Sequence, residues 1–191
     1  MQPEYHNVLL VTKDNKISSK ITDILVRPIF NVSLTSNFNE ARRIIMEQQY
    51  SIIIVDFNDN FDLDFSFDAA DSSAVVILIV PANHFDHISF EAEKYGILTV
   101  VKPFDTFYFY NIIKIALAVH NKIKALSSQT IKLQEKMEEI RLINKAKFIL
   151  IKENNMTEEE AHKYIEKNAM DNCVTKVTIA KNIINRCSNN F

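Results

Sequence analysis

Short apolar runs alternate with longer polar stretches over the first 104 residues of the chain. The runs are rich in β-branched residues and predict strands at residues 8–11, 32–34, 52–55, 75–80 and 97–101. Nearly continuous apolar runs are typical of strands that are covered on both faces. We therefore predict a doubly wound α/β domain, with a five-stranded parallel sheet and helices on both sides.

The polar stretches between these runs carry apolar residues at helical spacing. Residues 17–26 predict one helix, and Asn37 with Glu40 has the spacing of a helix start. The segment 56–71 is rich in Asp and Phe. We interpret it as an irregular surface loop whose phenylalanines lie on the fold, with a binding patch as the alternative.

The back half of the chain has a different pattern. From Phe104 onward there is no glycine and no proline, which predicts mostly helix. Starting from Phe109, apolar residues recur at alternating spacings of three and four, so residues 105–145 are predicted to form a parallel coiled coil that joins two copies of the chain. The predicted dimer seam contains Ile112, Val119, Ile123, Leu126, Leu133, Met137 and Ile140.

The first two turns of this predicted helix and the polar residues 127–130 each allow an alternative to a continuous coiled coil. A single helix packed back on the first domain explains the first two turns better than the later ones. Residues 127–130, which are polar, are a candidate break or soft spot. Polar Thr130 and Asn144 fall on seam positions, where they would set the register at some cost in stability.

The last 50 residues predict three short helical segments. The first continues the coil and ends near residues 154–155. The second begins at Thr157, which forms a capping box with Glu160, and the third covers about residues 174–184. We place Tyr164 and Met170 in the core of this region.

Composition narrows the function. One glycine excludes the glycine-rich loops of nucleotide-binding proteins, and two cysteines exclude a disulfide framework. No apolar run approaches the ~20 residues of a membrane span. The start of the chain lacks the features of a signal peptide, so we expect a soluble cytoplasmic protein without a membrane partner. Residues 1–104 carry net charge −6 and residues 141–191 net +3, which favours a polyanionic partner for the C-terminal end.

Candidate chemistry lies where the predicted strands end. Asp56 follows the third strand, and Lys102-Pro103-Phe104 follows the fifth. On these residues, the first domain (residues 1–120) resembles the receiver domain of two-component response regulators. The resemblance implies that Asp56 matches the phosphoacceptor and that Lys102 contacts the phosphoryl group.

The same resemblance exposes three departures. Receivers hold Mg²⁺ with an acidic pair directly after the first strand, where this chain has Thr12 and Lys13, leaving Asp14 one step further on. Pro81 stands where a hydroxyl residue is expected, and Thr99 stands where an aromatic residue usually precedes the lysine by three positions. We therefore predict no cofactor, doubtful Mg²⁺ binding and a receiver-like domain that ordinary phosphorylation does not switch. A functional receiver is the alternative.

The C-terminal part (residues 128–191) resembles the ANTAR domain, a three-helix RNA-binding unit of antitermination regulators. The matching elements are Arg141, Ile143, Ala146-Lys147, Leu150, the Thr157-x-x-Glu160-Ala161 opening, Ala169-Met170, and Ile179-Ala180 with Ile183. Phe148 departs from the family, which usually has glycine there. The resemblance implies binding to RNA.

Basic side chains in this region can neutralise the phosphates of an RNA loop, and small ones permit close approach. For Tyr164, stacking on a base is the alternative to a place in the core. The candidate RNA contacts are Arg141, Lys145, Lys147, Lys163, Lys167, Thr175, Lys176 and Lys181.

We conclude from the sequence that the chain is a dimeric antitermination regulator, not an enzyme, that binds leader hairpins in nascent RNA. A sensor kinase or a sequestering protein is an additional partner left open. The alternatives are a dimeric signalling scaffold whose receiver-like domain binds proteins and, third, a DNA-binding response regulator. No metal site is expected.

Overall fold

The computed structural model describes residues 5–26, 28–58 and 60–188. The chain divides into two compact units, Met1–Leu126 and Ser127–Phe191. One long helix, α5 (Thr106–Asn154), contributes residues to both units. Each unit is described by itself below.

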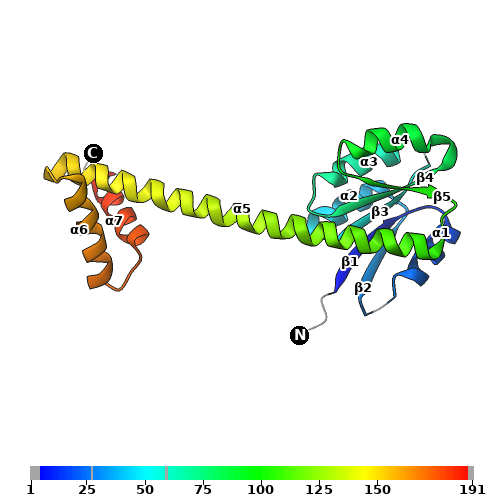
Figure 1. The fold of residues 1–191 in the computed structure, drawn as a ribbon, viewed down its shortest axis with the longest axis horizontal. Coiled ribbons are helices and arrows are strands. Elements are labelled where there is room, and N and C mark those ends of the chain that lie inside the picture. The colour runs from blue at the N-terminus through cyan, green and yellow to red at the C-terminus, as the bar shows by residue number, and fades with distance from the viewer. Residues whose placement is uncertain (1–4, 27, 59, 189–191) are drawn as a thin grey trace. The chain divides into compact units, whose positions relative to one another are not determined.

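The first unit is built on a parallel sheet of five strands. The strands are β1 (His6–Val11), β2 (Phe30–Thr35), β3 (Ile52–Asp56), β4 (Val75–Pro81) and β5 (Leu98–Lys102). Their order in the sheet is β2-β1-β3-β4-β5, and every neighbouring pair is parallel (Figure 1). This confirms the predicted doubly wound fold, with each strand at its predicted place and one to three residues longer or shifted at its ends.

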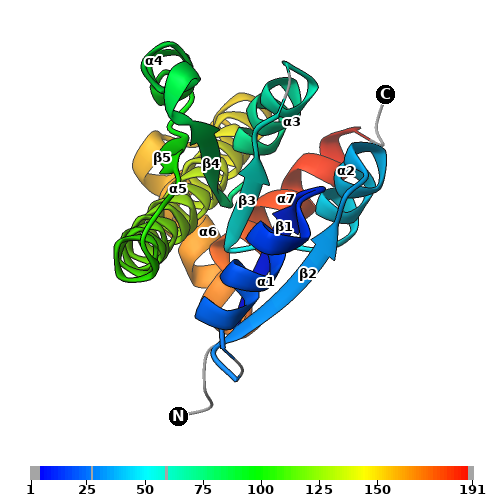
Figure 2. The same ribbon diagram turned by 90° about the vertical axis from the view of Figure 1, so that its right-hand side faces the viewer.

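Helices cover both faces of this sheet (Figure 2). The connecting helices are α1 (Asn15–Ile24), α2 (Phe38–Glu47), α3 (Asn60–Ala70), the short 3-10 turn η1 (Ala82–His84) and α4 (Phe85–Glu93). One core cluster joins the sheet to α1 and the start of α5, and the other joins it to α2, α3 and α4. The central strands are buried on both sides, which is why they are apolar almost throughout.

The predicted loop over residues 56–71 is wrong, because α3 occupies most of that segment. Phe65 and Ala69, four residues apart, are fully buried on the face of α3 that packs on the sheet. Phe65 also meets Phe38 of α2 edge to face, with ring centroids 5.4 Å apart. Helical spacing of a few apolar residues therefore outweighed the poor helix propensity of the aspartates.

Capping side chains set where two of the helices begin. Asp14 accepts hydrogen bonds from the backbone N–H groups of Lys16 and Ile17, so α1 begins at Asn15, earlier than predicted. Asn37 caps α2 in the same way, as predicted.

The first turns of α5 belong to the core of the first unit. Phe109, Ile113 and Ala116 are fully buried there, and Ile112 packs against the same cluster. This part of α5 follows the alternative of a helix packed on the first domain, and the partly buried Ile112 contacts that core. Further along, the remaining seam residues are all exposed: Val119, Ile123, Leu126, Leu133, Met137 and Ile140. The helix continues without a break through residues 127–130.

The second unit packs the end of α5 against α6 (Glu158–Asp171) and α7 (Lys176–Ser188). Its core contains Ala146, Leu150, Ala161, Ile165 and Ala180. The small alanines let the three helices approach closely. The predicted capping box is present: Thr157 accepts from the N–H of Glu160, whose carboxylate accepts from the N–H of Thr157.

Two residues with positive φ turn the chain between these helices. Asn155 follows α5 with φ 51°, and Cys173 follows α6 with φ 53°. Asn adopts this left-handed conformation more readily than most residues, so it serves where glycine is absent. The third helix begins at Lys176 and ends at Ser188, later at both ends than predicted.

Two core assignments in this unit are wrong. Tyr164 is 40% exposed and Met170 is 72% exposed. Both lie on α6, whose buried face is narrow because Ala161, Ile165 and Ala169 fill it.

Candidate functional site

The carboxyl ends of three strands bring Thr12, Asp56 and Lys102 together. Asp56 is the last residue of β3 and is 1% exposed. The Thr12 hydroxyl donates to Asp56 Oδ2 at 2.8 Å. The Lys102 ammonium forms an ion pair with Asp56 Oδ1 and donates to the carbonyl of Phe57 at 3.1 Å. Both carboxylate oxygens therefore have a partner within the protein.

The other candidate residues at this edge of the sheet make other interactions. The carboxylate of Asp14 caps α1, accepting from the N–H of Lys16 at 2.7 Å, and its own N–H donates to Thr12 Oγ1 at 3.0 Å. Lys13 lies over the ring of Phe38, with Nζ 5.7 Å from the centroid. Pro81 ends β4 and pairs in register with Lys102.

These residues do not fit Mg²⁺. The ion takes near-octahedral oxygen ligands, with one or more carboxylates from the protein. Here a hydroxyl and an ammonium occupy the two oxygens of Asp56, and Asp14 is committed to a helix cap. The Lys13 side chain adds a positive charge at the position of an expected carboxylate. We therefore derive no step through a metal.

The arrangement is a buried ion pair, in which Asp56 Oδ2 accepts a hydrogen bond from Thr12 and Oδ1 meets the Lys102 ammonium without accepting a hydrogen bond. The Asp56 side chain is completely buried and that of Lys102 is 21% exposed. A buried carboxylate is tolerated when a cation and hydrogen bonds compensate for its lost hydration, and Lys102 and Thr12 supply both. Phosphoryl transfer would have to displace one of these partners.

In the second unit, four candidate RNA contacts are held by acidic partners. Lys147 pairs with Glu158 at 2.9 Å, Lys163 with Glu159 at 2.6 Å and Arg141 with Glu138 at 3.3 Å, and Lys176 pairs with Glu166. The hydrogen bond from Lys147 lowers the pKa of Glu158, and that from Lys176 lowers the pKa of Glu166.

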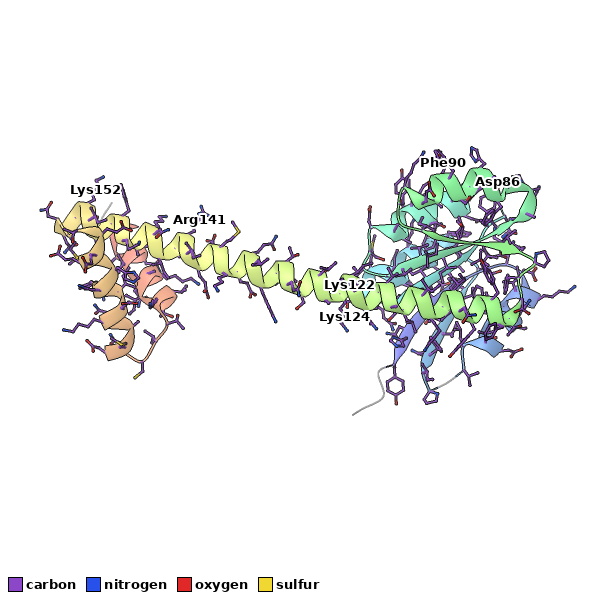
Figure 3. All side chains as sticks on the ribbon, viewed as in Figure 1. Asp86, Phe90, Lys122, Lys124, Arg141 and Lys152 are labelled. Carbon is purple, nitrogen blue, oxygen red and sulfur yellow. The ribbon has the colours of Figure 1, made fainter. Side chains whose placement is uncertain are left out.

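The remaining candidates differ from these. Lys145, Lys167 and Lys181 are exposed, and none of them forms an ion pair with another described residue. Thr175 has a structural task, because its hydroxyl accepts from the N–H of Thr178 at 3.2 Å at the start of α7. Figure 3 shows Arg141 and the neighbouring basic Lys152 projecting from α5.

Sequence reasoning missed the exposed apolar side chains of this unit. Phe148 is 65% exposed and stands beside Lys147 in the chain, and Tyr164 and Met170 are exposed on α6. One sequence signal pointed to Phe148, since the ANTAR family usually has glycine there. For Tyr164, the helical phase was misleading because the residues around it already fill the narrow core.

Comparison with known proteins relates the second unit to a domain family and the first unit to a fold. Residues 132–184 match the family model of the ANTAR domain. The first unit has the fold of a response regulator receiver protein from Burkholderia phymatum, with a TM-score of 0.52 and 16% identity, covering 59% of this chain and 95% of that one. A structure described as adenylate cyclase from Rhodopirellula baltica gives a TM-score of 0.60 at 17% identity, covering 68% and 99% of the two chains. At such identities the likeness shows the fold alone.

One curated relative is the transcriptional regulatory protein PdtaR of Mycobacterium tuberculosis, found in two strains. It is 26% identical over 111 residues, which cover 58% of this chain and 54% of the relative. The chain thus spans about half the length of the relatives it matches. It carries an ANTAR domain at residues 132–184, is homologous to PdtaR, and has the receiver fold in its first unit.

Among the described residues, no helix is both long and apolar enough to cross a membrane.

Proposed function

We propose that this chain is a transcription antitermination regulator that binds hairpin loops in nascent RNA, and that it is not an enzyme. The ANTAR domain at residues 132–184 is the observation that carries the proposal. The name of the homologue, a transcriptional regulatory protein, supports the same process. Because nascent transcripts are made in the cytoplasm, we expect the chain to act there.

The surface of the second unit has the chemistry that this role needs. Lys145, Lys167 and Lys181 are exposed without an ion pair among the described residues, so contact with RNA phosphates costs them no internal partner. Tyr164 and Phe148 present aromatic faces on which unstacked loop bases can stack.

The paired basic residues are expected to contribute less. Lys147, Lys163 and Lys176 would have to exchange a glutamate for a phosphate. That exchange replaces one ion pair by another, so the net gain in affinity is smaller than for an unpaired lysine. Arg141 is also paired with a glutamate, but its side chain is 80% exposed, so we expect its contribution to affinity to be intermediate.

We further propose two copies of the chain per functional unit. The exposed seam from Val119 to Ile140 supports this, because an apolar stripe at heptad spacing is stabilised by burial against a second helix. The proposed parts are a receiver-like domain (1–120), a coiled coil (105–145) and the ANTAR domain with its flanks (128–191).

RNA binding is tested by fluorescence anisotropy against a panel of two-hairpin leader RNAs, with the same sequences annealed as full duplexes for comparison. We expect selective binding to the hairpin form. Replacing Lys145, Lys167 and Lys181 by Gln should weaken binding and reduce the salt slope by about 0.7–0.9 for each RNA phosphate that the protein no longer neutralises.

The matched control is Lys122→Gln, which removes one exposed charge from α5 within the first unit (Figure 3). It should leave both affinity and slope unchanged. An unchanged slope in the triple variant, or equal losses in the control, would instead favour a signalling scaffold without RNA binding.

We also propose that phosphorylation does not switch the first unit. Supporting this, the two oxygens of Asp56 are engaged by Thr12 and Lys102, and the residues around them do not fit Mg²⁺. Incubation with acetyl phosphate and Mg²⁺ should leave the intact mass unchanged. A stoichiometric gain of one phosphoryl group would reject the proposal.

A further inference from the structure

A second feature lies beside the Asp56 site, at the carboxyl ends of β4 and β5. It is a cavity of about 390 Å³ lined by Lys16, Ile17, Lys20, Pro81, Lys102, Pro103 and Phe104. The volume lies within the range of pockets that hold small organic ligands. In open parallel sheets such ligands bind beyond the carboxyl ends of the strands.

The apolar walls come from three elements. Ile17 is partly buried on α1, Pro81 ends β4, and Pro103 and Phe104 follow β5. Phe104 is 7% exposed and is backed by Phe109, with ring centroids 4.6 Å apart. The Phe104 side chain is therefore held in place by the core of the first unit.

Two of the three lysines have no carboxylate partner in an ion pair within the described part of the chain. The Lys20 ammonium donates to the carbonyl of Phe104 and lies 4.5 Å from the centroid of its ring. Lys16 is exposed and forms no ion pair with another described residue. The third, Lys102, is neutralised by Asp56.

Two exposed carboxylates lie near these lysines: Asp14, which accepts from the backbone N–H of Lys16 at 2.7 Å, and Asp105. The backbone N–H of Tyr108 lowers the pKa of Asp105, with a smaller contribution from the charge of Lys20. Asp105 uses its carboxylate to accept from the N–H groups of Phe107 and Tyr108, at 2.8 and 3.0 Å, and does not line the cavity. The cavity thus keeps an excess of positive charge over apolar walls.

We propose that this cavity binds a small organic anion with an apolar body, such as an aromatic carboxylate, sulfonate or phosphate ester. The apolar body would lie among Ile17, the two prolines and the exposed edge of the Phe104 side chain, and the anionic group would meet Lys16 and Lys20. Charge complementarity favours an anion, and the apolar walls favour a ligand with more carbon than an inorganic ion. The proposal is independent of RNA binding.

The test uses the full chain and a fluorescent probe of this class, 1-anilinonaphthalene-8-sulfonate. Its uncharged analogue, N-phenyl-1-naphthylamine, has the same apolar body without the anion. We expect the Lys16→Gln/Lys20→Gln double variant to weaken binding of the sulfonate about tenfold or more, and to leave binding of the uncharged analogue within about twofold.

Lys94→Gln is the matched control, because Lys94 also lies 4.5 Å from an aromatic centroid, that of Phe90, but outside the cavity. It should bind both probes as the unmodified chain does. Equal weakening in this control, or no weakening in the double variant, would overturn the proposal. Competition by inorganic phosphate at the same concentration as the probe would show that the apolar body is not recognised, and would also overturn it.

A second measurement avoids dependence on the fold of the variants. Amide chemical shifts of the unmodified chain, followed by NMR during titration with the sulfonate, should change most at Ile17, Lys20 and Phe104. Changes confined to the exposed apolar residues of α5 would place the probe on the dimer seam and reject the cavity as its site.

Discussion

Asp56 occupies the position of a phosphoacceptor, but the acidic pair and the hydroxyl residue that normally surround one are absent from this chain. Its carboxylate receives a hydroxyl from Thr12 and an ammonium from Lys102. The Asp56 side chain has no exposed surface, so its carboxylate has lost its hydration. The contacts with Thr12 and Lys102 compensate for that loss. Such a group stabilises the fold while it is paired and destabilises it strongly when a partner is removed.

Lys102→Met should therefore destabilise the first unit by about 3–5 kcal/mol, because the Asp56 carboxylate remains buried without its cation. Urea denaturation followed by circular dichroism measures the loss. Adding Asp56→Leu to the same chain should recover much of it, since the unpaired charge is then gone.

The control is Lys94→Met, which breaks an ion pair with Glu91 whose two side chains are 50% and 38% exposed. Exposed pairs of this kind contribute about 0–1 kcal/mol. A Lys102→Met variant no less stable than this control would contradict the stabilising role of the buried ion pair.

At the scale of single elements, caps decide where the helices of the second unit begin. The box of Thr157 and Glu160 satisfies N–H groups at the start of α6 that would otherwise lack partners. The backbone N–H of Thr157 is also the main reason why the pKa of Glu160 lies below its ordinary value.

Thr157→Ala should lower the stability of α6 by about 0.5–2 kcal/mol, as measured by amide hydrogen exchange in its first turns. The sign of the pH effect follows from Glu160. A lowered pKa in the folded chain means that its contribution is present above the ordinary pKa of glutamate and is lost as the pH falls through the lowered value.

Glu160→Gln should accordingly flatten this acid dependence, whereas Glu159→Gln, which removes only the exposed pair with Lys163, should not. Equal protection in Thr157→Ala and the unmodified chain would contradict the role of the box.

The helix α5 carries a second element-scale property, its exposed seam. Val119, Ile123 and Leu126 follow directly on a segment that the first unit buries, so the apolar period continues after the intramolecular partner has ended. A second helix can bury an apolar stripe of this kind.

Leu126→Glu with Leu133→Glu should convert dimers into monomers in analytical ultracentrifugation, because a charge buried at a seam position is costly. Ser128→Glu with Lys132→Glu adds the same acidic side chains at positions of α5 outside the seam and should leave the dimer intact. Dimers that survive the first pair of changes would place the interface elsewhere.

At the scale of the whole molecule, the receiver fold and the ANTAR domain share the single helix α5. In a phosphorylation switch, the charge change at the phosphoacceptor would bias the state of the second unit. We have proposed that the Asp56 site does not supply that input, and on this proposal the RNA-binding form is expected to be assembled without it. Control would then come from a partner or a ligand of the first unit.

Asp56→Asn should for this reason bind hairpin RNA with the affinity of the unmodified chain, within the factor of ten that corresponds to about 1.4 kcal/mol. Its dimer fraction should also be unchanged. A loss of RNA binding confined to this variant, with the circular dichroism spectrum intact, would show that the site still controls the second unit.

Much of this architecture could be predicted from local pattern. Strand positions followed from β-branched runs, and the cap at Asn37 and the box at Thr157 followed from residue spacing alone. The proximity of Asp56 and Lys102 could be expected from the resemblance to receiver domains and from their positions after two strands, since parallel strands bring their carboxyl ends to one edge. These features depend on interactions within a few residues or on a strong topological rule.

Other features depended on what each side chain meets in three dimensions. The helix over residues 60–70 exists because Phe65 finds a buried site on the sheet. Tyr164 is exposed because alanines and Ile165 already fill the narrow core beneath α6. Lys147 and Lys176 are paired with glutamates far along the chain, whereas Lys167 and Lys181 form no ion pair with a described residue, and charge counting cannot separate the two groups.

The sequence by itself determined the order of the strands, the receiver-like fold, the resemblance to the ANTAR domain and the residues that stand at the strand ends. Only the tertiary structure decided that Thr12 donates to Asp56, that Asp14 caps α1, and that three lysines surround an apolar cavity. The physical reason is that hydrophobic period and capping act locally, whereas burial, ion pairing and cavities depend on which surfaces the whole fold brings into contact.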